Sequence, residues 1–133
     1  MTGEDMRDFA RRFMAAIQAG DAETLRGLYH PDATIWHNTD GIEQSVEQNL
    51  RLMAWMQRTL PDRTYRVQRV EALPDGFVQQ HALEATLPNG QPWRLDACAI
   101  VRVTDGRVTR LDEYLDSGQA NQLSAALAGQ GRP

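Results

Sequence analysis

Apolar residues in the first sixty positions recur at three- and four-residue spacing, and this period is typical of amphipathic helices. Three helices are therefore expected before the middle of the chain. A fourth apolar pattern closes the sequence. The expected helices cover residues 2–19, 22–29, 41–60 and 117–127.

The second half of the chain changes to short β-rich runs bounded by turn residues, which favours strands. Strands are expected at residues 33–37, 63–73, 77–87, 91–103 and 107–116. The pairs Asn89-Gly90 and Asp105-Gly106 are strong signals for two-residue hairpin loops. The sequence therefore predicts an α+β fold, with helices packed on one face of an antiparallel meander.

Two-residue loops fix which side chains share a face of this sheet. The count places His81 opposite Cys98, and Cys98 opposite Glu113. One extra residue in either turn would move a strand's side chains to the other face. We expect the Asn89-Gly90 count to be the firmer one, since a bulge can follow Asp105-Gly106. The face expected to be inward carries Phe77, Gln79, His81, Leu83, Asp96, Cys98, Ile100, Leu111, Glu113 and Leu115.

Both faces of the predicted sheet are too apolar to be exposed to solvent, so each is expected to pack against another element or another chain. We expect one face to meet the helices and the other to meet a second subunit. Ionisable groups such as His81, Asp96 and Glu113 are costly to bury unless they are paired or hydrated. The inner face is therefore expected to border a wet pocket.

Composition narrows the function. The 133 residues fit one domain, residues 1–133, with a Gly-rich tail at 128–133 that we expect to fray. The net charge is −4 and all 14 cations are Arg, which argues against a nucleic-acid partner. A single cysteine, Cys98, excludes an intrachain disulfide and a cysteine-based metal site. No apolar run approaches the roughly 20 residues that cross a bilayer, so a cytoplasmic protein without a membrane partner is expected.

One histidine stands out as candidate chemistry. His37 ends the first predicted strand, directly after Trp36. Histidine has an unperturbed pKa of about 6.5, so it can exchange protons near neutrality. His37 is therefore a candidate acid or base in a pocket. The alternative is a purely structural histidine bonded to a buried partner such as Tyr29.

The chain resembles the NTF2-like superfamily, and within it the SnoaL-like polyketide cyclases and the ketosteroid isomerase relatives. The resemblance covers nearly the whole chain. It rests on residues 19–21 (Ala-Gly-Asp), 28–33 (Leu-Tyr-His-Pro-Asp-Ala), 89–92 (Asn-Gly-Gln-Pro), 105–108 (Asp-Gly-Arg-Val) and 112–116 (Asp-Glu-Tyr-Leu-Asp). It implies a cone: N-terminal helices packed on a curved sheet that encloses an apolar pocket, with dimers formed through the outer sheet face.

The resemblance also assigns roles to positions. His37 matches the catalytic base of ketosteroid isomerases, whereas Phe13 and Ala99 match their two oxyanion donors and cannot donate a hydrogen bond. Steroid isomerisation by that route is therefore not expected. Glu113 matches the acidic residue in the last strand of the epoxide hydrolases of this superfamily. The isomerase match turns Ala97 and Ala99 inward, against the hairpin count, and the sequence leaves that conflict open.

Two hypotheses follow. The first is an enzyme without a cofactor or metal that performs acid–base chemistry on a small apolar molecule: an isomerase, cyclase, dehydratase or epoxide hydrolase. The second is a non-catalytic ligand-binding or dimerisation module. The first requires His37 and an acid within hydrogen-bond reach, open to a cavity. Its expected catalytic residues are His37, Glu113 and His81, and its expected substrate-binding residues are Phe13, Trp36, Met53, Trp55, Gln79, Asp96, Leu111 and Leu115.

Overall fold

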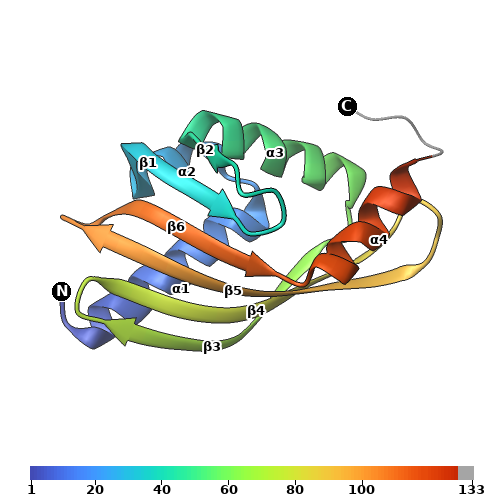
Figure 1. Ribbon diagram of the computed structural model, residues 1–133. Coiled ribbons are helices and arrows are strands. Elements are labelled where there is room, and N and C mark those ends of the chain that lie inside the picture. The colour runs from blue at the N-terminus through green and yellow to red at the C-terminus, as the bar shows by residue number, and fades with distance from the viewer. Residues whose placement is uncertain (129–133) are drawn as a thin grey trace.

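A curved six-stranded sheet with strand order β2-β1-β6-β5-β4-β3 forms the body of the computed structural model, which describes residues 1–128 (Figure 1). Of the tail predicted to fray, 128–133, only Ala128 lies within the described residues. The helices are α1 (Gly3–Ala19), α2 (Ala22–Leu28), α3 (Val46–Thr59) and α4 (Ser117–Leu127). The strands are β1 (Tyr29–His37), β2 (Glu43–Gln44), β3 (Thr64–Leu73), β4 (Gly76–Thr86), β5 (Pro92–Thr104) and β6 (Arg107–Leu115).

Helix α1 matches its prediction closely. The side chain of Thr2 accepts a hydrogen bond from the backbone N–H of Asp5, and the side chain of Asp5 accepts one from the backbone N–H of Thr2. Gly20 ends the helix with a φ of 67°, a left-handed conformation that favours glycine. One face of α1 packs into the core, and Figure 1 shows the helix lying across the sheet.

Strand β1 is longer than predicted. It begins at Tyr29, so Pro31 lies inside the strand, where the register shifts between Tyr29 and Thr34. The strand pairs in parallel with β6, and the predicted antiparallel meander of four strands is confirmed as β3 to β6. Parallel neighbours need a crossover connection.

Helix α3 starts five residues later than predicted, at Val46. Glu43 and Gln44 form the short strand β2, which pairs with β1, and Ser45 caps the helix together with Gln48. Backbone pairing with the edge of β1 therefore replaces the expected first turn of helix. Figure 1 shows that α3 begins beside β2 and extends toward α4.

The predicted register of β4 and β5 is wrong by one residue. Leu87 N donates to Gln91 O at 2.8 Å, which leaves a three-residue loop, 88–90, instead of the expected two. His81 therefore lies opposite Ala97, not Cys98. The loop with the stronger sequence signal is the one that was miscounted.

The register of β5 and β6 is also wrong by one residue, for a different reason. Asp105 and Gly106 do form a two-residue turn, with φ values of 52° and 76°. A bulge between Arg102 and Val103 then shifts the pairing, so Glu113 lies opposite Ala99.

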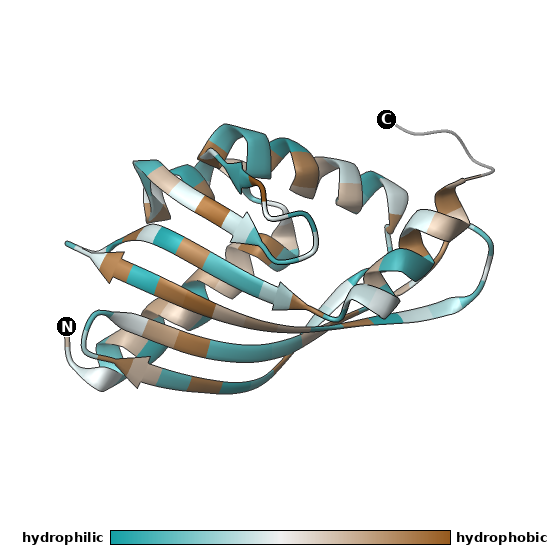
Figure 2. Cartoon of the chain, viewed as in Figure 1, coloured by the Kyte–Doolittle hydropathy of each residue, from teal (hydrophilic) through white to brown (hydrophobic). Residues whose placement is uncertain are grey.

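The two register errors cancel between β4 and β6, so the side chains of these strands face the predicted sides of the sheet. The side chains of β5 face the sides opposite to those predicted. His81 and Glu113 share the inner face as expected, whereas Ala97 and Ala99 replace Asp96 and Cys98 as the inward residues of β5. Ile100, also expected to face inward, is 44% exposed. Figure 2 shows the alternation of apolar and polar residues along these strands.

The core divides into two clusters. The larger one joins α1, β1 and the inner faces of β5 and β6, and the smaller one joins Leu60, Leu83, Leu87, Trp93 and Leu95 beside α4. Within the described residues, no helix has the length and apolarity required to cross a membrane.

Candidate active site

Two connected cavities lie between the inner face of the sheet and helices α1, α3 and α4. The outer chamber has a volume of about 820 Å³ and extends beneath α4. The inner chamber has a volume of about 100 Å³ and reaches toward α1. Six residues line both chambers and so mark their junction: His37, Leu52, Met56, Tyr65, His81 and Glu113.

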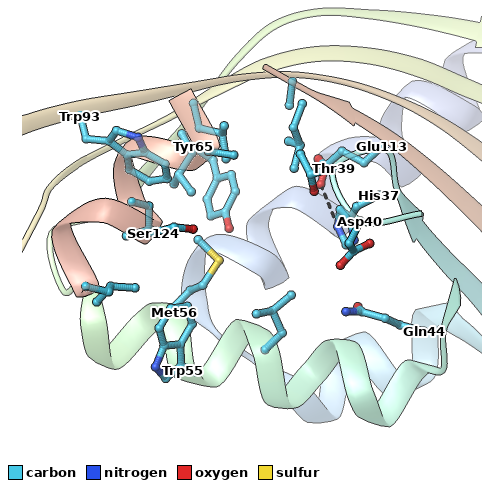
Figure 3. A pocket seen from close by; sticks show the side chains of 18 of the residues that line it. His37, Thr39, Asp40, Gln44, Trp55, Met56, Tyr65, Trp93, Glu113 and Ser124 are labelled. Atoms are coloured by element: carbon cyan, nitrogen blue, oxygen red, sulfur yellow. Dashed lines mark ion pairs between the residues drawn. The ribbon is translucent and has the colours of Figure 1, made fainter. Parts of the chain in front are cut away.

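The junction contains a carboxylate held between two histidines. His37 Nε2 lies 3.2 Å from Glu113 Oε1, and His81 Nε2 lies 3.2 Å from Glu113 Oε2. The side chains of His37, His81 and Glu113 are 12%, 6% and 18% exposed. Figure 3 shows His37 and Glu113 meeting at one side of the cavity. Each carboxylate oxygen therefore accepts one imidazole N–H.

Burial and hydrogen bonding act in opposite directions on Glu113. Burial by itself raises the pKa of the carboxyl, but the bonds from His37 and His81 outweigh it and hold the pKa at about 2. Burial likewise lowers the pKa of His37, and the bond to Glu113, its charge and that of Asp40 together raise it above 6.5. The site thus favours an ionised Glu113 beside a readily protonated His37.

The hydrogen bonds also assign the imidazole tautomers. Both histidines present Nε2 to the carboxylate, so Nε2 carries the proton and Nδ1 of each neutral ring carries a lone pair. Gln79 Nε2 lies 3.0 Å from Nδ1 of His81 and donates to it. No hydrogen bond to Nδ1 of His37 is found within residues 1–128, and His37 lines both chambers. This nitrogen is therefore a candidate base.

The backbone places His37 beside Glu113. The two residues are partners in the parallel pair of β1 and β6, so their side chains leave the sheet on the same face. Asn38 extends the pairing by one step, because its N–H donates to Glu113 O at 3.1 Å. His81 reaches the same carboxylate from β4, two strands away, across the small residues Ala97 and Ala99 of β5.

Two tyrosines add neutral donors to the walls. Tyr65, on β3, lies at the junction, and its ring centroid is 6.1 Å from that of His81. Burial and the charge of Glu113 raise the pKa of Tyr65 to about 12. Figure 3 shows its hydroxyl pointing into the cavity. Tyr29 lines the inner chamber, and burial raises its pKa as well, so both phenols keep their protons at neutral pH.

Most residues predicted for the site do line a chamber. The three expected catalytic residues, His37, His81 and Glu113, meet at the junction. Phe13, Met53, Gln79 and Leu111 line the inner chamber, and Trp55 and Leu115 line the outer one. His37 bonds Glu113, not Tyr29, and it opens to a cavity, which is the geometry that the enzyme hypothesis requires.

Trp36 and Asp96 do not line either chamber. Consecutive strand residues point to opposite faces, so with His37 inward Trp36 points outward, where its ring lies 5.3 Å from that of Tyr114. Asp96 lies on the outer side because of the reversed β5, and it pairs with Arg94 at 2.8 Å. Arg94 and Asp96 therefore cannot partner Glu113 as the epoxide-hydrolase comparison suggested.

Sequence reasoning missed Tyr65 and the wall formed by α4. Tyr65 is paired with Leu83, two residues from His81 on one face of β4, but a register shift between Val67 and Arg69 sets that pairing and the sequence does not signal it. Helix α4 contributes Ala120, Leu123, Ser124 and Leu127 to the outer chamber. Nothing in its short apolar pattern indicated which surface it would cover.

The arrangement suits proton transfer. A basic nitrogen, an ionised carboxylate that orients it and neutral hydroxyl donors surround an apolar cavity. Across residues 1–128 no group of three or more His, Cys, Asp or Glu side chains is arranged to hold a metal ion.

Comparisons with known proteins agree with this architecture. A family model described as the SnoaL-like domain matches residues 10–111. The crystal structure of IdmH, a proposed polyketide cyclase from Streptomyces antibioticus, is 26% identical, with a TM-score of 0.78 over 91% of this chain and 96% of that one. PrhC from Penicillium brasilianum is 16% identical, with a TM-score of 0.86 over 98% of this chain and 92% of that one. No curated protein matches the sequence.

Proposed function

Because this chain belongs to the SnoaL-like domain family of the NTF2-like superfamily, we propose that it is an enzyme that removes a proton next to a carbonyl group of a small, largely apolar molecule. The contacts that join the side chains of His37, Glu113 and His81 at the junction of the chambers are the observation that supports this proposal. The likeness to IdmH favours a cyclase-type reaction among the outcomes of such a step.

His37 is the proposed general base. In this proposal the Nδ1 lone pair receives the substrate proton while Nε2–H stays bonded to Glu113. When Nδ1 takes the substrate proton, the new imidazolium lies directly against an ionised carboxylate, which stabilises it. The contact with Glu113 raises the pKa of His37, which makes it a stronger base than a free imidazole.

Tyr65 is the proposed donor to the oxygen on which negative charge develops. Loss of the α-proton moves the C–H electron pair toward the carbonyl oxygen, and a neutral O–H aimed into the cavity stabilises that charge. The family's usual donor positions hold Phe13 and Ala99 here, so Tyr65 supplies from β3 what they lack. The proton on His37 then returns to carbon or oxygen of the product.

Exchange of α-protons for deuterium tests this proposal without knowledge of the natural substrate. The purified protein is incubated in D2O with 2-indanone or 1-tetralone, and loss of the α-proton signal is followed by NMR. We expect His37→Asn to lower the protein-dependent rate by about 10²–10⁴-fold, the usual contribution of a positioned base.

The matched control is His30→Asn. His30 lies on the same strand, is exposed and accepts a bond from Asp32 N at 3.0 Å, outside both chambers. The His30→Asn variant should exchange the α-protons of the ketone as fast as the wild type does. Equal rates for wild type and His37→Asn would refute the acid–base proposal and favour the second hypothesis, a ligand-binding module. Cytoplasmic location and a homodimer remain proposals beside this one.

A further inference from the structure

The inner chamber is lined by two polar residues that leave part of their hydrogen-bonding capacity unused among residues 1–128. Its walls are mostly apolar, with Phe13, Ile35, Met53, Phe77 and Leu111 among them. Gln79 and Tyr29 also line it, and each residue is only 2% exposed.

Gln79 leaves an acceptor free. Its Nε2 donates to His81 Nδ1, which holds His81 in the tautomer that bonds Glu113. Its Oε1 is buried and has no hydrogen-bond partner among the described residues. Gln79 also borders a groove between α1 and β3.

An unpaired buried acceptor is unusual in a folded protein. Such a group is explained when an occupant of the chamber donates to it. Tyr29 provides the complementary group, since its hydroxyl makes no hydrogen bond within residues 1–128 and burial keeps it protonated. The chamber therefore offers one acceptor and one donor on otherwise apolar walls.

A hydroxyl group fits this pair, because it donates one hydrogen bond and accepts another. A ketone oxygen would satisfy Tyr29 alone, and an alkyl group would satisfy neither residue. We propose that the inner chamber binds the hydroxyl group of an otherwise apolar ligand, with Gln79 Oε1 accepting its proton and Tyr29 donating to its oxygen. The proposal deepens the proposed function by naming the substrate class, and it rests on that function only in calling the ligand a substrate.

Phenol and toluene test the proposal, because they differ only by hydroxyl against methyl. Both are titrated into the protein, and the dissociation constants are measured by NMR. The decisive quantity is the ratio of the two constants, compared between wild type and Gln79→Met. We expect the wild type to bind phenol more tightly than toluene. In the variant this preference should be about tenfold smaller, which corresponds to the loss of one hydrogen bond to a buried acceptor.

Gln80→Met is the matched control. Gln80 is the next residue of β4, is exposed and lines neither chamber. Its ratio should stay within about twofold of the wild type, since less than 0.5 kcal/mol is involved. If Gln79→Met fails to fold, Tyr29→Phe decides by the same ratio, because it removes one oxygen and keeps the ring.

Unchanged ratios in the folded variants would overturn the proposal and leave a resident water as the partner of Gln79 Oε1. The two proposals fail separately. If Gln79→Met lowers the preference for phenol but the wild type exchanges no α-protons, the hydroxyl site is supported and the enzyme proposal is refuted. If α-proton exchange depends on His37 but the binding ratios do not change, the enzyme proposal is supported and the hydroxyl site is refuted.

Discussion

The side chain of Asn38 binds both backbone groups of Leu115: its Oδ1 accepts from Leu115 N at 2.8 Å, and its Nδ2 donates to Leu115 O at 3.2 Å. The amide thus imitates one more residue of the parallel ladder between β1 and β6. His37 and Glu113 are the ladder partners immediately before it. Asn38 therefore fixes the strand ends that carry the reacting pair.

Replacing Asn38 by alanine should loosen this pair. We expect Asn38→Ala to lower the free energy of unfolding by about 1 kcal/mol, since water replaces part of the lost bonding at this exposed site. The α-proton exchange rate should fall by about tenfold, because small displacements of a base are costly. Histidine NMR titration should show the pKa of His37 falling as its bond to Glu113 weakens.

Asn89→Ala serves as the control for that variant. Asn89 also bonds a nearby backbone group, accepting from Gln91 N at 3.0 Å, but in a loop outside both chambers. It should lose stability without any change in the titration of His37. An unaltered His37 pKa in Asn38→Ala would contradict the positioning role of Asn38.

Glu113→Gln should break the reacting pair while preserving its shape. An amide offers one acceptor and one donor, so one of the two imidazole N–H groups would meet an N–H. We expect the exchange rate to fall by about 10²–10⁴-fold. Because the bond to Glu113 and its charge raise the pKa of His37, that pKa should fall in the variant. A His37 titration identical to wild type would contradict the assigned contact.

The same pair predicts how stability depends on pH. The carboxyl of Glu113 has a folded pKa of about 2 against an ordinary value of 4.5, so its contribution is complete above about 4.5 and is lost as pH falls toward 2. The pKa of His37 is raised above 6.5, so its contribution is complete below about 6.5 and is lost as pH rises through the folded value. The stability difference between wild type and Glu113→Gln should be largest from about pH 4.5 to 6.5, as measured by denaturation.

The sequence predicted the inner face of the sheet better than it predicted any single strand. Side chains alternate with a period of two, so each hairpin miscounted by one residue reverses a strand. A three-residue loop at 88–90 and a bulge at Arg102 each added one residue, and the two shifts cancelled between His81 and Glu113. Asp96 lay on the strand between them and was placed on the wrong face.

Other features depended on contacts that local patterns do not encode. Pro31 marks the end of a helix by composition, yet it lies within β1, in the stretch between Tyr29 and Thr34 where the register with β6 shifts. Trp36 was placed beside His37 in the pocket, against the alternation that the same strand prediction required. Tyr65 and α4 reach the cavity only through tertiary packing, so their roles appeared with the structure.

The outer face of the sheet yields the last prediction, a homodimer. Ile100 on β5 and Tyr114 on β6 are 44% and 48% exposed, and each lies on the side opposite the chambers. A glutamate at the centre of a dimer interface would be buried without a partner, at a cost of several kcal/mol. Ile100→Glu should therefore change a dimer into a monomer in light scattering. Val67→Glu should not, although Val67 is 45% exposed, because it borders the groove between α1 and β3. A wild-type protein with the mass of one chain, or an Ile100→Glu protein with the mass of two, would contradict the predicted interface.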